Sequence, residues 1–385
     1  MSTDWQVLRG QAPASGVESV PMENDWPTIS TSGPPSVSPP GDSAYAHFVR
    51  EFDRLAALAG ERLRVEWSHH QREDLRRLSR ELSENAIEFG RLLRVVFRHG
   101  LIAALHDEAA WSVATLGARG SRQDGFALVL ESWIVAIQGI IKPPECNELA
   151  APLQALRQAL PDMVRAARVP AQKAVPAEVD RLVSSVVSGD VAAADRLLRA
   201  ALAQRSAPET VVTDLLLPAM AEVGSRWERN ELAIFQEHMA TETVRHLLAI
   251  LPLVAEQGAR IGQTALVSCV PQDEHQLAPL ALGTYLRLRG WPVRLLGGSL
   301  PAAEIARAVA ALSPQTLFLS LSMLSRLEEA LDAAACVRAV APACRIVVGG
   351  RGAQPARDVL ERSSALVALS FEDAHRLALE ATRDA

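Results

Sequence analysis

One loop of this sequence places a histidine two residues after a carboxylate. Asp273 and His275 stand in the stretch VPQDEHQLA, directly after an apolar run. An imidazole can ligate a metal through one ring nitrogen, while a carboxylate on the other nitrogen fixes the tautomer and raises the basicity of the ligand. The pair therefore indicates a metal-ligating loop. The alternative interpretation is a surface histidine without a chemical role, which is the commoner case for a single loop histidine.

Small residues follow two later apolar runs. Ser320 and Ser322 close the third run, and Gly349, Gly350 and Gly352 stand at the end of the fourth. Small side chains let a large ligand approach the backbone, although they equally permit close packing of a helix on a strand. The GGRG stretch lacks the Lys-Ser/Thr of a P-loop, so it is a weak candidate for a phosphate loop.

Residues 262–385 alternate short apolar runs with helical stretches, which is typical of a parallel sheet covered by helices on both faces. The five predicted strands are 264–270, 293–297, 316–322, 345–350 and 365–369. A doubly wound sheet of this kind binds ligands at the carboxyl ends of its strands, so the histidine, serine and glycine loops should meet there.

The upstream parts of the chain are predicted to be helical, so the fold class is α plus α/β. Residues 176–257 are predicted to form a four-helix bundle, in which Asp190 caps the second helix. Residues 44–168 are rich in helix formers and predict an all-α domain. Residues 1–43 contain seven prolines and eight serines, which favours a disordered tail. The predicted bundle helices are 178–189, 190–204, 207–230 and 232–256.

The bulk properties exclude several classes of protein. The net charge of −6 gives no support for a basic, duplex-binding face. The four cysteines form no CxxC pair, and no apolar run reaches the roughly 18–20 residues of a membrane span. The N-terminus lacks the features of a signal peptide, and no nucleophile–base pair accompanies the Asp-x-His loop. We therefore expect a cytoplasmic protein that is not an enzyme and does not bind membranes.

Together these loops resemble the cobalamin-binding domain of methionine synthase, the mutases and CarH-type photoreceptors. The family pattern is D-x-H-x-x-G, then a Ser after the third strand and Gly-Gly after the fourth, whereas Ala278 stands here in place of the first Gly. The resemblance implies a Rossmann-like domain that binds cobalamin base-off, with His275 as the lower axial ligand of cobalt. The methyl group of Ala278 puts in doubt how the dimethylbenzimidazole tail fits. The implied cofactor-binding residues of this domain are Asp273, Glu274, His275, Ser320, Ser322, Gly349 and Gly350, with the tail between the serines and the glycines.

The bundle carries a second resemblance. Trp227, followed after nine residues by Glu237-His238, matches the W-x9-EH signature of CarH-type light sensors. The resemblance, which covers residues 176–385, implies that these residues bind an adenosyl upper ligand. It also implies that light breaks the cobalt–carbon bond and that His238 is a cobalt ligand after photolysis. Without the downstream domain, a core tryptophan and an exposed Glu-His pair would be the simpler interpretation.

The N-terminal helical domain contains aromatic, histidine and arginine side chains that suit a tetrapyrrole with propionates. The alternative is a solvated basic stripe and core tryptophans. The domain order resembles that of photocobilins, which implies biliverdin as a second chromophore, with haem in a globin-like site as the rival. Cys146 could anchor a bilin, although a noncovalent site is equally consistent. The residues considered are His47, His69, His70, His99, His106, Trp67, Trp111, Trp133, Arg91, Arg94 and Arg98.

The predicted function is light sensing by an adenosylcobalamin-binding, homo-oligomeric protein that signals through a downstream protein partner. The N-terminal half shows no winged helix-turn-helix of the MerR kind, so we do not expect direct DNA binding. Two alternatives remain. One is a corrinoid carrier for methyl transfer, and the other is a cobalamin-dependent antirepressor that acts through a protein partner.

Overall fold

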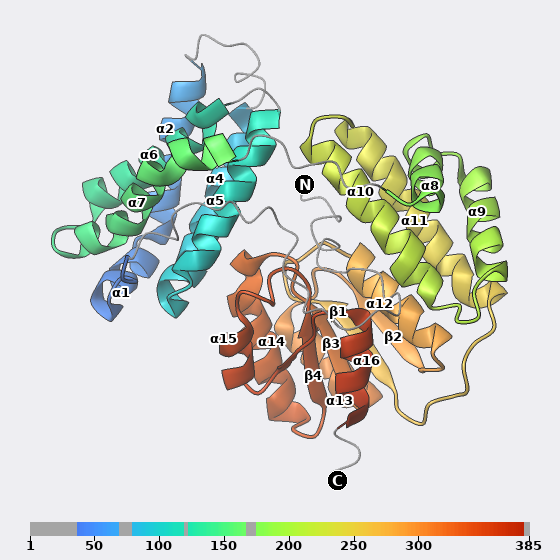
Figure 1. Cartoon of the computed structure of the whole chain (residues 1–385). Helices are drawn as coiled ribbons and strands as arrows, with labels where there is room; N and C mark the ends of the chain where they lie inside the picture. Colours follow the sequence, from blue (N-terminus) through green and yellow to red (C-terminus); the bar gives the residue numbers. More distant parts are fainter. Residues whose placement is uncertain (1–36, 69–78, 119–121, 167–174, 381–385) are drawn as a thin grey trace. The chain divides into compact units, whose positions relative to one another are not determined.

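The computed structural model describes residues 37–68, 79–118, 122–166 and 175–380 (Figure 1). Most of the predicted tail, His69 and His70 therefore lie outside the described residues. The chain divides into two compact units, one of N-terminal helices and one that contains the bundle and the sheet. No helix within the described ranges combines the length and apolar character needed to cross a membrane.

The N-terminal unit is helical, as predicted. Its core is a cluster of aromatic rings in which the fully buried Trp133 lies beside Phe48 and Phe52. The indole of Trp133 donates to the carbonyl of Ala86 at 3.1 Å. A Cβ at Gly90 would lie 2.3 Å from the Trp133 ring, so only glycine fits there. The helices are α1 Asp42–Arg50, α2 Phe52–Ser68, α4 Ser79–His99, α5 Ile102–Ala118, α6 Arg122–Ile140 and α7 Glu145–Ala166.

The residues considered for a second chromophore range from fully buried to exposed. Trp133 is a core tryptophan, as the simpler interpretation has it, and Cys146 is buried. Arg91 forms an ion pair with Glu88, and the guanidinium of Arg94 lies 5.1 Å from the centre of the Phe52 ring. Arg98 is exposed, and the other side chains are partly exposed: His47, His99, His106 and Trp111. The side chain of Trp67 lies outside the described residues.

The bundle consists of four helical segments, as predicted. They are α8 Ala177–Val187, α9 Val191–Ala203, α10 Leu217–Glu228 with a π-helical start at Val212–Leu216, and α11 Ile234–Val254. Asp190 caps α9, because its side chain accepts the N–H of Ala193 at 2.9 Å. Pro218 has no N–H to give to a carbonyl four residues back, and the N–H of Leu217 bonds to Val212, five residues back. We predicted this segment to start at position 207, but it starts a few residues later, because residues 206–209 form bends and turns.

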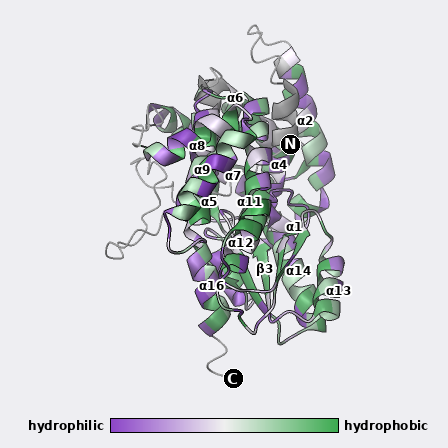
Figure 2. Ribbon diagram, turned by 90° about the vertical axis from the view of Figure 1, so that its right-hand side faces the viewer, coloured by the Kyte–Doolittle hydropathy of each residue, from purple (hydrophilic) through white to green (hydrophobic). Residues whose placement is uncertain are grey.

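The sheet has five parallel strands in the order β2-β1-β3-β4-β5, which confirms the doubly wound prediction. All five residues of strand β3 are buried, and its central residues Leu317, Phe318 and Leu319 are hydrophobic, as expected of a strand covered on both faces (Figure 2). The strands are β1 Ala265–Cys269, β2 Val293–Gly297, β3 Thr316–Ser320, β4 Arg345–Gly349 and β5 Leu366–Val367. Strand β2 is added on one side of β1 and β3 on the other, so the strand order reverses between β1 and β3, and ligands bind outside such a switch point.

Five helices cover the sheet. They are α12 Leu277–Leu288, α13 Ala302–Leu312, α14 Leu327–Val340, α15 Arg357–Arg362 and α16 Phe371–Glu380. Right-handed crossovers place α12 on one face and the three helices that follow it on the other. Helix α16 contacts α12, so these two share a face. The space between them lies over β1, β3 and β4.

The bundle is attached to the sheet through α12. The N–H of Gly258 donates to Leu288 at 2.7 Å, and the N–H of Ile261 donates to Gly290 at 2.9 Å. On the helix itself, the hydroxyl of Thr284 donates to the carbonyl of Leu248 at 3.2 Å. The linker after α11 is therefore fixed to the end of the helix that follows the Asp-x-His loop.

Candidate functional site

The Asp273–His275 loop forms a buried hydrogen-bonded unit at the end of β1. Oδ1 of Asp273 lies 2.5 Å from Nδ1 of His275 and accepts the His275 backbone N–H at 3.0 Å. Oδ2 accepts the backbone N–H of Ser322, which follows β3, at 2.9 Å. Both side chains are almost completely buried. The structure thus joins the loop after β1 to the loop after β3, across the switch point.

The protonation of this pair follows from its surroundings. Burial raises the pKa of Asp273, but the hydrogen bonds from His275 and Ser322 outweigh burial and hold the pKa below its usual value. An ionised carboxylate can only accept, so Nδ1 of His275 donates, and an imidazole with its one proton on Nδ1 carries its lone pair on Nε2. This is the tautomer that a metal-ligating histidine needs.

Nε2 of His275 is buried and has no hydrogen-bond partner among the residues that the structure describes. A buried polar atom without a partner costs about 1–3 kcal/mol. A buried imidazole nitrogen without a protein partner is the arrangement expected of a ligand to a metal that is supplied from outside the chain. Within the described ranges, no group of three or more His, Cys, Asp or Glu residues could hold a metal ion.

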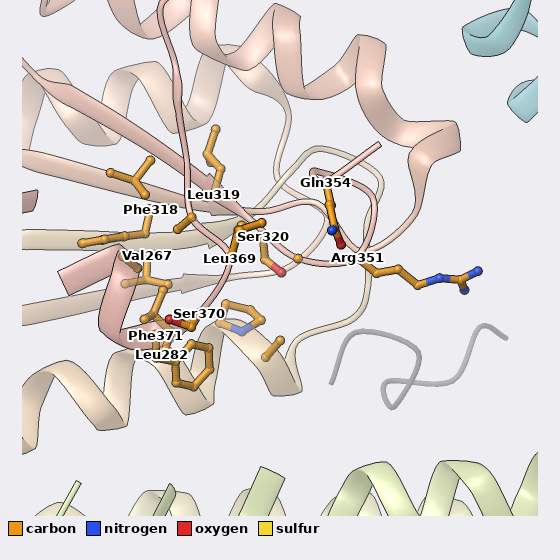
Figure 3. Close-up of a pocket in the computed structure, with 17 residues that line it drawn as sticks. Val267, Leu282, Phe318, Leu319, Ser320, Arg351, Gln354, Leu369, Ser370 and Phe371 are labelled. Carbon is orange, nitrogen blue, oxygen red and sulfur yellow. The ribbon is translucent and has the colours of Figure 1, made fainter. Parts of the chain in front are cut away.

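An apolar cleft of about 690 Å³, its open mouth included, lies over the same end of the sheet (Figure 3). Its floor follows the strand register, since Val267, Phe318 and Val347 pair in one row across β1, β3 and β4. Ser320 and Gly349 pair two residues further along, nearer the strand ends. The walls come from α12 and α16 and from the loop after β4, and they include Ala278, Pro279, Leu282, Phe371, Ala374, Gly350, Arg351 and Gln354.

The two glycines at the end of β4 differ in what requires them. Gly350 has a φ of +105°, and a Cβ there would lie 2.5 Å from the carbonyl oxygen of Leu321, so the fold itself demands glycine. A Cβ at Gly349 would meet only Ala368, at an ordinary distance of 3.5 Å. The protein leaves room beside Gly349, and that room belongs to the cleft.

The structure separates the two serines that the sequence placed together. Ser320 lines the cleft, whereas Ser322 is not among its lining residues. The backbone N–H of Ser322 instead positions Asp273. Of the two serines, only Ser320 therefore lies at the cleft, and the position of the nucleotide tail stays a prediction.

The remaining candidates lie on the bundle and on the loop. Trp227, at the end of α10, is partly exposed, and Glu274 is exposed. Glu237 is only 1% exposed and accepts the hydroxyl of Thr241 at 2.9 Å, while its neighbour His238 is exposed. A glutamate is seldom so deeply buried, which distinguishes Glu237 from the exposed pair of the simpler interpretation.

Sequence reasoning missed most of the cleft walls. Ala278 and Leu282 are four residues apart on one helix, so helical spacing from the Asp-x-His loop could have found Leu282. Phe371 and Ala374 stand about a hundred residues away, and only the packing of α16 against α12 brings them to the cleft.

The bundle and the sheet domain match two protein-family models, and the chain is similar to two curated proteins. Two family models, both described as B12 binding domain, match residues 178–251 and 263–378. The chain is 33% identical over 172 residues to the HTH-type transcriptional repressor CarH of Myxococcus xanthus, a match of 44% of this chain and 57% of that protein. It is 34% identical over 153 residues to the repressor CarA of the same organism, covering 38% of this chain and 49% of CarA. The chain thus spans about half the length of the curated relatives it matches.

Among solved structures, the monomethylamine corrinoid protein of Methanosarcina barkeri is similar with a TM-score of 0.46 and 20% identity. The match covers 53% of this chain and 98% of that protein. A likeness at this level carries no argument about function.

Proposed function

We propose that this protein senses light through a bound adenosylcobalamin, because B12 binding domain models match its C-terminal half and that half is similar to the repressor CarH. The observation that supports cobalamin most strongly is the buried Nε2 of His275, which has no hydrogen-bond partner in the part of the chain that the structure describes. The residues present fit the cofactor, because an imidazole that is held by Asp273 through Nδ1 stands at the same sheet edge as an apolar cleft.

In this proposal His275 would hold the cobalt through Nε2. Asp273 keeps the imidazole proton on Nδ1, and the N–H of Ser322 fixes the carboxylate in turn. The cleft at Ser320, Gly349 and Gly350 takes the nucleotide tail, and its apolar walls exclude water from the base. When bound, the cofactor supplies a cobalt–carbon bond that light can break.

The bundle supplies the residues proposed for the upper side. Trp227 and Glu237 would contact the adenosyl group, which the W-x9-EH spacing and the burial of Glu237 support. His238 is exposed on α11 and is proposed as the protein ligand that reaches cobalt after the adenosyl group leaves. Because α11 packs on α12, a shift of the bundle would be transmitted to the cobalamin loop.

Illumination of the reconstituted protein tests this proposal. The protein is loaded with adenosylcobalamin in the dark and exposed to green or blue light, while the visible spectrum and the oligomeric state are followed. We expect rapid photolysis and a change of assembly. The variant His238→Ala should alter the spectrum after illumination, whereas His246→Ala, an exposed histidine on the same helix, should not. A chain that shows neither rapid photolysis nor a change of assembly is not a photoreceptor.

Two other functions are compatible with cobalamin binding. A corrinoid carrier for methyl transfer would use the same His275 loop, but its loading and activity would not depend on Trp227 or Glu237. An antirepressor would differ from the photoreceptor in its output alone. We propose that output passes through homo-oligomerisation and a protein partner, rather than through direct DNA contact. A light-dependent shift of a DNA fragment by the purified protein would contradict that part.

Biliverdin in the N-terminal helices remains a proposal that rests on the likeness to photocobilins. The burial of Cys146 favours a noncovalent site over a thioether at this cysteine. Addition of biliverdin should produce a far-red absorption band. Absence of that band, together with binding of haem, would favour the globin-like alternative.

A further inference from the structure

The polar groups of the cleft are concentrated at its mouth. Gln354 is exposed, and the side chain of Arg351 extends away from the cluster of lining residues (Figure 3). The hydroxyl of Ser370 accepts the N–H of Asp373 at 3.0 Å and so caps α16. Ser320 therefore supplies the side-chain polar group nearest the interior.

Three backbone N–H groups around the cleft already have protein partners. The N–H of Leu321 donates to Gly349 at 2.8 Å, and the N–H of Ala368 donates to Val348 at 2.9 Å. The N–H of Leu369 is taken by the carboxylate of Asp373 at 3.0 Å. Deeper in the cleft the floor is the row of Val267, Phe318 and Val347, and the walls carry hydrocarbon side chains.

A ligand base that enters this interior loses its hydrogen bonds to water and is surrounded by hydrocarbon side chains. A purine base carries an exocyclic amine and several ring nitrogens, each of which needs a hydrogen-bond partner once buried. A dimethylbenzimidazole has one ring nitrogen besides the glycosidic one, and a cresol base has none. The hydroxyl of Ser320 and the amide of Gln354 at the exposed end cannot pair every ring nitrogen and the amine of a purine, so at least one buried group would stay unpaired, which weakens binding on the order of tenfold or more.

We propose that this cleft selects corrinoids by their lower base, accepting apolar aromatic bases of the benzimidazole or phenol type and discriminating against purines. The inference rests on the proposed function, in which the tail of the cofactor lies in the cleft. The methyl group of Ala278 acts in the same direction, because it adds hydrocarbon where a glycine would leave the backbone exposed.

The test compares the binding of corrinoids that differ only in the base. Adenosyl forms with a cresol base, an adenine base and no nucleotide are titrated in the dark, and binding is followed by the absorption change on histidine ligation. The cresol base cannot coordinate its own cobalt and adenine does so weakly, so competition from self-coordination is small. We expect the cresol form to bind at least about tenfold more tightly than the adenine form, a difference of about 1.4 kcal/mol.

A pair of variants assigns the effect to the cleft. Leu282→Gln places an amide on the α12 wall, and we expect it to reduce the preference for cresol over adenine about fivefold or more. Leu280→Gln makes the same change on the same helix outside the cleft and should leave the preference unchanged. The form without a nucleotide should bind all three proteins equally, which verifies that the variants fold.

The possible results are distinct. Equal affinity for the cresol and adenine forms, or the same preference in wild type and Leu282→Gln, would overturn the base selectivity while leaving cobalamin binding intact. Failure of the wild-type protein to bind any of the three corrinoids would instead overturn the proposed function, and the selectivity with it.

Discussion

Replacement of Asp273 by asparagine removes acceptors that three buried N–H groups require. Oδ1 accepts from the backbone and the ring of His275, at 3.0 and 2.5 Å, and Oδ2 accepts from Ser322 at 2.9 Å. An amide has one acceptor oxygen, and its NH₂ group must face an N–H donor whichever way it is turned. The arrangement that preserves most bonds turns the oxygen toward His275 and leaves the Ser322 N–H unpaired.

The magnitude follows from these contacts. A buried N–H without a partner costs about 1–3 kcal/mol, so Asp273→Asn should lower the free energy of unfolding of the unloaded protein by about 2 kcal/mol. His275 also loses the negative charge on its second nitrogen. Loss of such a partner typically reduces metal affinity about 10–100-fold, and we expect a decrease of that size for adenosylcobalamin.

Two measurements check this prediction. Urea unfolding followed by circular dichroism gives the stability, and titration in the dark followed by absorption gives the affinity. Glu304→Gln is the control, since it neutralises an exposed carboxylate on α13 and should change stability by less than about 0.5 kcal/mol. If Asp273→Asn behaved like Glu304→Gln in both assays, the role assigned to the buried pair would be refuted.

Three further changes test other parts of the structure. Burial, aided by Arg289, lowers the pKa of His375 from 6.5 to about 4, so between these values the unfolded chain binds a proton that the folded chain does not. Stability should therefore fall by about 1–2 kcal/mol from pH 6.5 to 4, after allowance for partial exposure, and His375→Asn should remove this loss in urea unfolding at the two pH values. Gly349→Val should fill the cleft and weaken cobalamin binding by about 1–3 kcal/mol while corrinoids without a nucleotide bind normally, and equal losses for both would contradict the cleft assignment. Asp190→Ala should lower unfolding stability by about 1 kcal/mol, whereas no change would show that the α9 cap is unimportant.

The sheet could be predicted from the sequence because its strands are buried on both faces. Continuous apolar runs located β1, β3 and β4 to within two residues. Strand β5 is shorter than the predicted 365–369, since only Leu366 and Val367 pair with β4 at the edge of the sheet. The start of the third bundle helix was also misplaced, because periodicity does not show that the chain around Pro208 forms a turn before the helix.

The site was predictable where its parts are local in the chain. Asp273 and His275 are two residues apart, so their pairing follows from spacing alone. The role of Ser322 was not predictable, because it depends on which backbone N–H faces a carboxylate 49 residues away. The wall at Phe371 likewise depends on the packing of α16 against α12, which no local pattern encodes.

The identity of the lower cobalt ligand is the central claim, and one measurement tests it most directly. The protein is produced with isotope-labelled histidine, loaded with adenosylcobalamin and photolysed without oxygen, and the electron paramagnetic resonance spectrum of the cobalt(II) form is recorded. If His275 is the ligand, the splitting from its nitrogen should change with the isotope and should disappear in His275→Ala. A splitting that does not change with the histidine isotope would arise from the base of the cofactor itself and would contradict the assignment.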